Sequence, residues 1–224
     1  MTELTVREAL LKRQSTRAYL DKPVSRELIE QILDSARHAP SGTNTQPWQV
    51  AVVTGESKRK LCTRMEQAFH DNVKRKMDYN YYPLEWSEPY KGRRKECGLQ
   101  MYSTLEITRE DKQRQLDQWA ANYRAFDAPA MLFFFIDRVM ETGSFFDYGM
   151  FFQSVMLEAV SRGLSVCPQA ALGEYPQIVR EELNYGDDKI LIAGMAIGYG
   201  DESARVNSYR TSRLEVDEFT RFYE

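Results

Sequence analysis

Arg13, Ser15 and Arg17 bring two guanidinium groups and a hydroxyl close together near the start of the chain. Arginine makes forked, charge-assisted hydrogen bonds to phosphate oxygens, and a serine hydroxyl adds another donor. The periodicity of residues 4–13 predicts a helix that leads straight into this cluster. The cluster is therefore a candidate anion site, although arginine and serine also occur together on surfaces that bind nothing.

A second candidate is the loop from Pro40 to Pro47, which concentrates small polar side chains between a predicted helix and a predicted strand. The prolines lower the conformational entropy of the unfolded loop, so its polar groups are held ready to bind. Ser41 and Asn44 suit the edge of a flat, amide-like heterocycle. An ordinary helix-to-strand connection is the alternative.

Cysteine and histidine restrict the chemistry that is available. Cys62, Cys97 and Cys167 are widely spaced and form no CxxC pair, which argues against a metal site and favours a reducing cytoplasm. A Cys–His or Ser–His catalytic pair would have to use His38 or His70. The alternative for both histidines is a position at the surface of a helix.

Residues 198–203, with the sequence GYGDES, nearly match the dinucleotide-binding fingerprint GxGxxG. That fingerprint needs a third glycine and a following apolar helix, and this chain has neither. We therefore predict a turn at the end of a strand. No GxxxxGK[ST] motif occurs, which excludes a P-loop kinase or ATPase.

Residues 79–97 combine aromatic rings with a basic run. The rings are Tyr79, Tyr81, Tyr82, Trp86 and Tyr90, and the basic residues are Lys91, Arg93, Arg94 and Lys95. Such a mixture could grip single-stranded nucleic acid. The whole chain has a net charge of −3 and no nucleic-acid motif, so we favour an aromatic loop between solvated helices.

Hydrophobic periodicity and turn residues predict the elements that position these groups. Helices are predicted over residues 4–13, 25–36, 57–79, 111–125, 147–162 and 175–184. Buried strands are predicted over 48–54, 130–137 and 190–199, and 130–137 is apolar on both faces and therefore central. The strands do not alternate strictly with helices, which favours an α+β fold over a doubly wound sheet.

The last segment, residues 201–224, is polar with spaced apolar side chains at Val206, Leu214, Val216, Phe219 and Phe222. It has too little apolar surface to offset the entropy of ordering it alone. We therefore expect this tail to cover another surface.

Composition agrees with a globular protein. Of the 224 residues, 42% are hydrophobic and 28% charged, which excludes gross disorder. The longest apolar run, 190–200, is too short to span a bilayer, and residues 1–14 do not resemble a signal peptide. We predict one domain over 1–224, without nucleic-acid or membrane partners.

Four segments in order resemble the FMN-dependent nitroreductase family. They are RQSTRAY at 13–19, APSGTNTQPWQV at 39–50, RGLSVCPQAA at 162–171, and GMAIGY at 194–199 followed by Asn207, Arg210 and Arg213. Together they extend over nearly the whole chain. The aromatic segment is similar to the nitrobenzoate-type branch of the family.

The resemblance implies a nitroreductase-like sandwich, in which helices flank a central, mostly antiparallel sheet. It also implies a homodimer with non-covalent FMN at the interface. Residues 79–100 would then be a lid insertion, and residues 201–224 an arm that is exchanged across the dimer. Such an arm would account for the polar tail.

The resemblance further implies a role for individual residues. Those expected at the FMN phosphate are Arg13, Ser15, Arg210 and Arg213, and Gln14 is expected to contact the cofactor. Those expected at the flavin ring are Arg17 beside the pyrimidine edge, Asn122, Pro168, Gln169, Ala170 and Ala171. Pro40, Ser41 and Asn44 would come from the other subunit, and Tyr82, Trp86 and Tyr90 would line the substrate lid.

The implied reaction needs no catalytic side chain. NAD(P)H would reduce the flavin at N5, supported by a backbone N–H of Ala170 or Ala171, and a nitroaromatic or quinone-like acceptor would then reoxidise it in a ping-pong cycle. Arg17 would stabilise the negative charge of the reduced ring. A flavin reductase or reductive dehalogenase on the same scaffold, and a non-enzymatic FMN-binding protein, remain alternatives.

Overall fold

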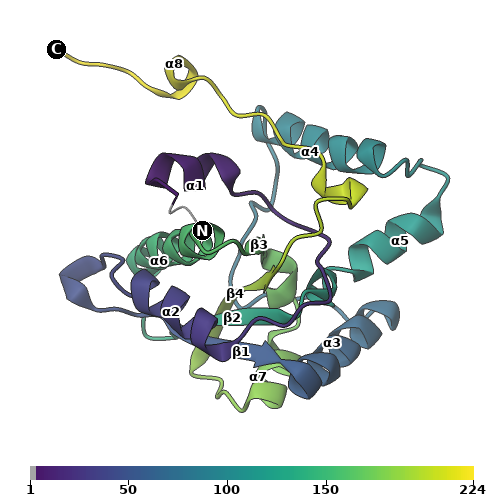
Figure 1. Cartoon of the computed structure of the whole chain (residues 1–224), viewed down its shortest axis with the longest axis horizontal. Helices are drawn as coiled ribbons and strands as arrows, with labels where there is room; N and C mark the ends of the chain where they lie inside the picture. The colour runs from purple at the N-terminus through teal and green to yellow at the C-terminus, as the bar shows by residue number, and fades with distance from the viewer. Residues whose placement is uncertain (1–3) are drawn as a thin grey trace.

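A four-stranded sheet forms the centre of the computed structural model, which describes residues 4–224 (Figure 1). The strands are β1 (Gln49–Thr54), β2 (Ala130–Asp137), β3 (Ser165–Gln169) and β4 (Lys189–Gly198). Their spatial order is β1-β2-β4-β3, and every neighbouring pair is antiparallel. The predicted α+β fold with an antiparallel sheet is confirmed.

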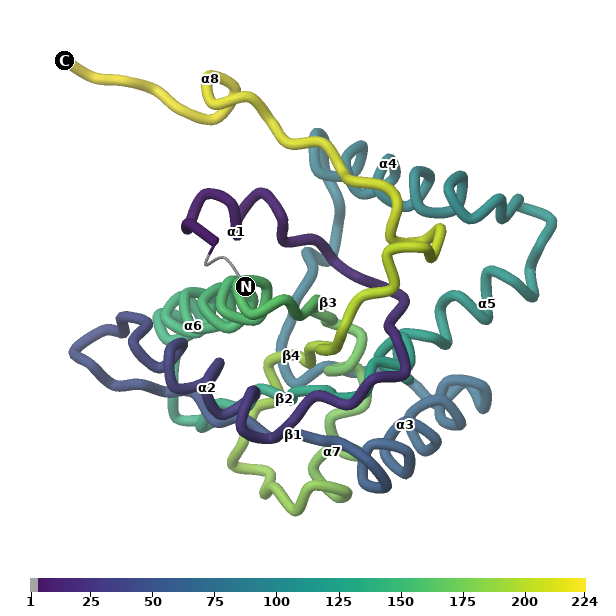
Figure 2. The backbone as a smooth tube through the Cα atoms, in the orientation of Figure 1, coloured from purple at the N-terminus to yellow at the C-terminus, as the bar shows by residue number. Residues whose placement is uncertain are grey.

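Helices cover both faces of the sheet. One face carries α2 (Arg26–Ala36) and α6 (Thr142–Ser161), and the other carries α3 (Gly55–His70) and α7 (Pro176–Leu183). α5 (Lys112–Ala120) is followed by residues 121–128, several of which pack in the same core as α3 and α7. α1 (Val6–Lys12), α4 (Tyr90–Thr104) and α8 (Val216–Phe219) lie outside both layers, on one side of the molecule (Figures 1 and 2).

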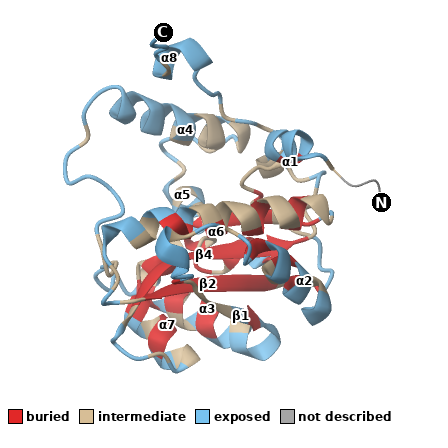
Figure 3. Cartoon of the chain, turned by 90° about the vertical axis from the view of Figure 1, so that its left-hand side faces the viewer, coloured by how far each residue is buried: buried red, intermediate tan, exposed pale blue. Residues whose placement is uncertain are grey.

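β2 separates two hydrophobic cores, because successive side chains of a strand point to opposite faces. Leu132 and Phe134 pack with the residues of α2 and α6, whereas Met131 and Phe133 pack with those of α3 and α7. Residues 130–136 are all buried, and Figure 3 shows the buried region concentrated in the sheet and α6. The central position predicted for this strand is confirmed.

Several predicted boundaries were wrong. α3 ends at His70 instead of residue 79, because Asn72 turns into the left-handed region with φ 54° and the chain beyond it is anchored elsewhere. The Asp78 carboxylate forms a buried ion pair with Arg180 at 2.6 Å and also accepts the N–H of Leu191 at 2.9 Å. These tertiary contacts hold Asp78 outside any helix.

α5 and α6 also differ from the predicted ranges. α5 ends at Ala120, five residues early, and a turn follows at η2 (Ala125–Asp127), where all three residues have positive φ. α6 starts at Thr142, five residues before the predicted start, so that Phe145 joins the core packing. Its predicted end is confirmed by Gly163, which has φ 78°.

Apart from the one-turn helix α8, two elements, α4 and β3, have no counterpart in the predicted ranges. α4 contains no buried residue, so it has no apolar face for a sequence pattern to reveal. β3 is short and includes Pro168, which is tolerated because this strand lies at the edge of the sheet. Both elements depend on contacts with distant parts of the chain.

The predicted turn after β4 is confirmed, and its glycines serve close packing. A Cβ at Gly198 would lie 2.5 Å from Cδ of Pro129, and one at Gly200 would lie 2.6 Å from Oγ of Ser165. Tyr19 also bridges to Gly200 across this turn. The glycines therefore let backbone segments approach one another, as glycine often does.

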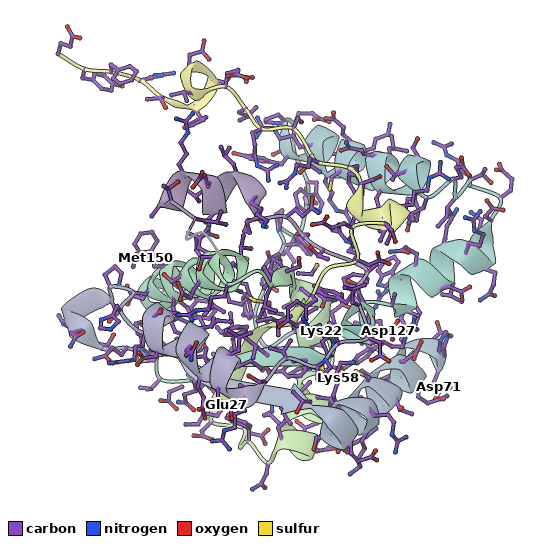
Figure 4. All side chains as sticks on the ribbon, in the orientation of Figure 1. Lys22, Glu27, Lys58, Asp71, Asp127 and Met150 are labelled. Atoms are coloured by element: carbon purple, nitrogen blue, oxygen red, sulfur yellow. The ribbon has the colours of Figure 1, made fainter. Side chains whose placement is uncertain are left out.

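The C-terminal tail leaves the body after passing α4. Its last side chains project into solvent (Figure 4), and the residues Phe219 and Phe222 are 66% and 83% exposed. α1 exposes apolar side chains nearby, at Val6, Leu10 and Leu11. The single chain therefore leaves the apolar residues of its tail uncovered.

Candidate functional site

The residues from Arg13 to Arg17 run along the free edge of β3. Ser15 forms a parallel bridge with Val166, and the N–H of Thr16 donates to the carbonyl of Val166 at 3.0 Å. α1 begins with a capping box at Thr5 and ends at Lys12, which releases Arg13 into extended backbone. The candidate anion residues are therefore held beside the end of β3.

A cavity of about 290 Å³ opens at this point, and its lining is rich in cations. It contains the residues expected at the phosphate, Arg13, Ser15, Arg210 and Arg213, together with Gln14 and with Arg17, which was expected at the pyrimidine edge of the flavin. Cys97 of α4 and both Tyr209 and Thr211 of the tail complete the polar lining. Sequence segments about two hundred residues apart thus meet in one site.

Arg13 lacks an anionic partner in this cavity. Burial lowers the pKa of its guanidinium, and the charges of Arg213 and Arg210 lower it further. Within residues 4–224, no side-chain acceptor forms a hydrogen bond or ion pair with this guanidinium. A partly buried cation beside two others is costly unless it is compensated, so the cavity is suited to an anionic ligand.

Arg210 has a structural task in addition to its place in the lining. Its guanidinium donates to the carbonyls of Leu11 at 2.9 Å and Lys12 at 2.8 Å, which closes the C-terminal end of α1. Arg213 instead donates to its own neighbours, Thr211 and Ser212. Arg210 thus fastens the tail to α1, whereas Arg213 is held only locally.

An apolar cavity of about 350 Å³ lies at the end of β3. Pro168, Gln169 and Ala170 form one wall. Aromatic side chains from the 79–81 segment and from α6 form the others, namely Tyr79, Tyr81, Phe145, Tyr148 and Phe152. The hydroxyl of Tyr79 donates to the carbonyl of Ile192 at 2.7 Å, which fixes the base of the aromatic segment.

The rings of the aromatic segment continue outward from this cavity. Tyr81 contacts Tyr82 with ring centroids 4.7 Å apart, and Tyr82 contacts Trp86 at 5.6 Å. The guanidinium of Arg94 lies over the Trp86 ring, 5.2 Å from its centroid. Tyr90 starts α4 and lines neither cavity.

Gln169 and Asn122 form a polar contact beside the apolar cavity. The Gln169 amide donates to the backbone carbonyl of Asn122 at 3.0 Å and to its Oδ1 at 3.3 Å. Oε1 of Gln169 is buried without a hydrogen-bond partner within the described chain. Asn122 therefore reaches the site through Gln169. Ala170 and Ala171 are the first two residues of the 3-10 turn η3 (Ala170–Gly173).

The loop with Pro40, Ser41 and Asn44 lines neither cavity. It is held by a hydrogen bond from the N–H of Gly42 to the buried Asp147 carboxylate, 3.1 Å long. Thr43, Asn44 and Gln46 all have positive φ, between 47° and 61°, in the left-handed region that non-glycine residues rarely adopt. Strain of this kind is characteristic of functional loops.

Neither a metal centre nor a membrane helix is found in residues 4–224. No group of three or more His, Cys, Asp or Glu side chains is arranged to hold a metal ion there. No helix in the same range is long and apolar enough to cross a membrane.

Comparison with known proteins identifies the family. The model of the nitroreductase family matches residues 10–199, which is most of the chain. The chain belongs to the nitroreductase family. A chloronitrobenzene nitroreductase from Comamonas testosteroni is 38% identical over 211 residues, covering 94% of this chain and 93% of that protein. A 4-nitrobenzoate reductase from Pseudomonas putida is 37% identical over 210 residues, covering 94% and 92%.

Solved structures agree with this assignment. The FMN- and NADPH-dependent nitroreductase NfnB from Sphigopyxis sp. strain HMH has 40% identity and a TM-score of 0.96, over 99% of this chain and 100% of that one. The FMN-dependent NfnB from Mycobacterium smegmatis, solved with NADPH, has 31% identity and a TM-score of 0.92, over 98% of each chain. The sandwich fold expected from the sequence is confirmed.

Several residues that line the two cavities of this nitroreductase were not predicted from the sequence. Tyr209 and Cys97 were not expected in the cationic cavity, nor Phe145 and Phe152 in the apolar one. Phe145 and Phe152 stand seven residues apart, which places them on one face of α6. That spacing is also typical of a core helix, so it did not by itself indicate a binding site.

Proposed function

We propose that this nitroreductase binds FMN and uses NAD(P)H to reduce nitroaromatic acceptors, with quinone-like acceptors as a related class. The observation that carries the proposal is that two cavities lie close to β3. At the end of α1, beside β3, a cluster of arginines lines a cavity in which Arg13 has no anionic partner among the described residues. An aromatic cavity lies at the end of the same strand. The cluster suits a phosphate, and the cavity suits flat rings. The names of the relatives support both the cofactor and the acceptor class.

The chain's own residues fit FMN. We assign its phosphate to Arg13, Ser15 and Arg213, with Gln14 and Arg210 supporting them. We assign the ring to Pro168, Gln169, Ala170 and Ala171, with Asn122 behind Gln169. When bound, FMN supplies the electron-transfer chemistry. Arg17 would stabilise negative charge at the pyrimidine edge, and a backbone N–H of Ala170 or Ala171 would donate a hydrogen bond to the ring.

We also propose a homodimer in which Pro40, Ser41 and Asn44 serve the partner's flavin. The supporting observation is the amount of apolar surface that one chain leaves exposed on α1, at the start of α6 and on the tail. Val6 is 72% exposed and Phe146 is 74% exposed. Exposed apolar patches of this kind are typical of protein interfaces. The strained loop next to α6 is consistent with a role across that interface.

We propose a cytoplasmic location. The support is that Cys62, Cys97 and Cys167 are all free, which agrees with a reducing compartment.

A single purified preparation tests the proposed function. We expect a yellow protein with about one FMN per chain that oxidises NADPH only when nitrobenzene is added. Protein that binds FMN but transfers no electrons would instead be an FMN carrier. Faster turnover with free flavin than with nitrobenzene would identify a flavin reductase, and a failure to bind FMN would refute the proposal.

Residues 79–100 are proposed to form a lid that selects the acceptor, through Tyr82, Trp86 and Tyr90. We expect Tyr82→Ala and Trp86→Ala to slow flavin reoxidation by nitrobenzene about twofold to tenfold, because a ring pair contributes about 0.5–1.5 kcal/mol. Flavin reduction by NADPH should change less. Stopped-flow absorbance measures the two half-reactions separately.

Trp119→Ala is the matched control, because this exposed tryptophan of α5 stacks on Phe69 and lines neither cavity. It should leave both half-reactions unchanged. Equal losses in both half-reactions for Tyr82→Ala or Trp86→Ala, with lower thermal stability, would mean that the segment is only structural. Arg94→Gln should affect 4-nitrobenzoate more than nitrobenzene, modestly because the cation is solvated.

A further inference from the structure

The tail holds the backbone of Arg17 through one asparagine. Oδ1 of Asn207 accepts the N–H of Arg17 at 2.7 Å, and its Nδ2 donates to the carbonyls of Ala18 at 2.9 Å and Asp201 at 2.8 Å. Asn207 lies in the 3-10 turn η4 (Arg205–Asn207) and is partly buried. Its carbonyl also accepts from the amide of Gln14 at 3.2 Å. The oxygen and the nitrogen of the Asn207 side-chain amide therefore both hold the backbone of residues 17 and 18.

The same stretch of tail also holds the side chain of Arg17. Nη1 of Arg17 donates to the Tyr209 hydroxyl at 3.3 Å and to the carbonyl of Ser15 at 3.3 Å. The guanidinium carbon lies 5.9 Å from the centroid of the Phe126 ring. Burial raises the pKa of Tyr209, so this phenol stays neutral at pH 7. The partners of Arg17 are thus uncharged groups.

No carboxylate neutralises Arg17 within residues 4–224, and its guanidinium lines the cationic cavity together with Tyr209. A neutral hydrogen-bond acceptor orients a cation without cancelling its charge. The full charge is then available to whatever occupies the cavity. Because Coulomb energy falls with distance, the benefit to a bound anion depends on how firmly the cation is held.

We propose that Asn207 and Tyr209 are positioning residues that fix Arg17 at the flavin and thereby set the reduction potential of the bound cofactor. This inference rests on the proposed function, because it assigns Arg17 to the pyrimidine edge of FMN. It makes the tail part of the redox site of its own chain. Reduced flavin carries negative charge at that edge, so a misplaced Arg17 destabilises the reduced form more than the oxidised form.

The test uses the holoprotein with FMN bound. Tyr209→Phe keeps the ring and removes only the hydroxyl that accepts from Arg17. We expect the preference for reduced over oxidised flavin to fall about tenfold, which corresponds to a midpoint potential about 30 mV more negative for a two-electron couple. Asn207→Ala should shift the potential in the same direction and should also lower stability, since it leaves the Arg17 N–H without a partner and removes one of two donors from each of the Ala18 and Asp201 carbonyls.

A double-mutant cycle separates positioning from general damage. If Tyr209 acts through Arg17, then Tyr209→Phe should change the potential little in an Arg17→Gln background. Ser208→Ala is the matched control, because its hydroxyl donates only to the carbonyl of Arg205 in the same turn, at 2.8 Å. It should leave the potential unchanged.

Two results would overturn the inference: an unchanged potential in Tyr209→Phe, or the same shift whether or not Arg17 is present. Failure of the proposed function is distinguishable, since the parent protein itself would then hold no FMN or would not be reduced by NADPH.

Discussion

Replacing Arg13 by alanine is expected to weaken FMN binding about tenfold to a hundredfold. A charge-assisted hydrogen bond to a phosphate contributes about 1.5–3 kcal/mol, and each 1.4 kcal/mol is a tenfold change in affinity. Arg213→Ala should have a similar effect. Titration of apoprotein with FMN, followed by flavin fluorescence, gives the dissociation constants.

The structure makes this prediction specific to the ligand. Arg13 has Arg210 and Arg213 as like-charged neighbours, and their charges lower its pKa. Its removal should therefore leave the thermal stability of the apoprotein unchanged or slightly higher. Arg210→Ala should instead lower that stability, because Arg210 closes the end of α1 through Leu11 and Lys12.

Arg7→Ala provides the control, since Arg7 is an exposed arginine of α1 outside the cationic cavity. It should bind FMN like the parent protein. Unchanged FMN affinity in both Arg13→Ala and Arg213→Ala would disprove the phosphate assignment.

Removing residues 214–224 is expected to abolish the dimer and, with it, retention of FMN. These residues extend away from the body of their own chain (Figures 1 and 3), and Phe219 and Phe222 are largely exposed. Burying each ring on a partner contributes about 1.5–3 kcal/mol. Two arms are lost per dimer, so the dissociation constant should rise by several orders of magnitude.

Removing all of residues 201–224 should impair the protein further, because it also takes away Asn207 and Arg210. The shorter truncation is the sharper test. Sedimentation velocity and the flavin absorbance of the purified protein provide the readouts, and circular dichroism verifies that the chain is folded.

Asp217→Asn with Glu218→Gln in the full chain is the control, because it changes the charge of α8 and leaves its apolar residues in place. That variant should stay dimeric and yellow. A truncated chain that remained a dimer with FMN bound would show that the arm is dispensable.

The sequence predicted those elements whose signals are local. The apolar run 130–137 had to lie between two layers, and the structure buries residues 130–136. Ser25 was a plausible cap, and its hydroxyl accepts the N–H of Leu28 at 3.2 Å. Gly163 ends α6 with the left-handed backbone that glycine allows. Each of these signals is contained within a few neighbouring residues.

By itself, the sequence also determined the family, because four short motifs stood in the right order, and it singled out the residues that could hold a phosphate. Only the tertiary structure decided how they meet. β3 exists through its pairing with β4, and that edge aligns Ser15 with Val166. From the far end of the chain, Tyr209 reaches Arg17 and Arg210 reaches the end of α1. Helix and strand periods report the environment of one segment, whereas a site depends on long-range pairing that no local pattern encodes.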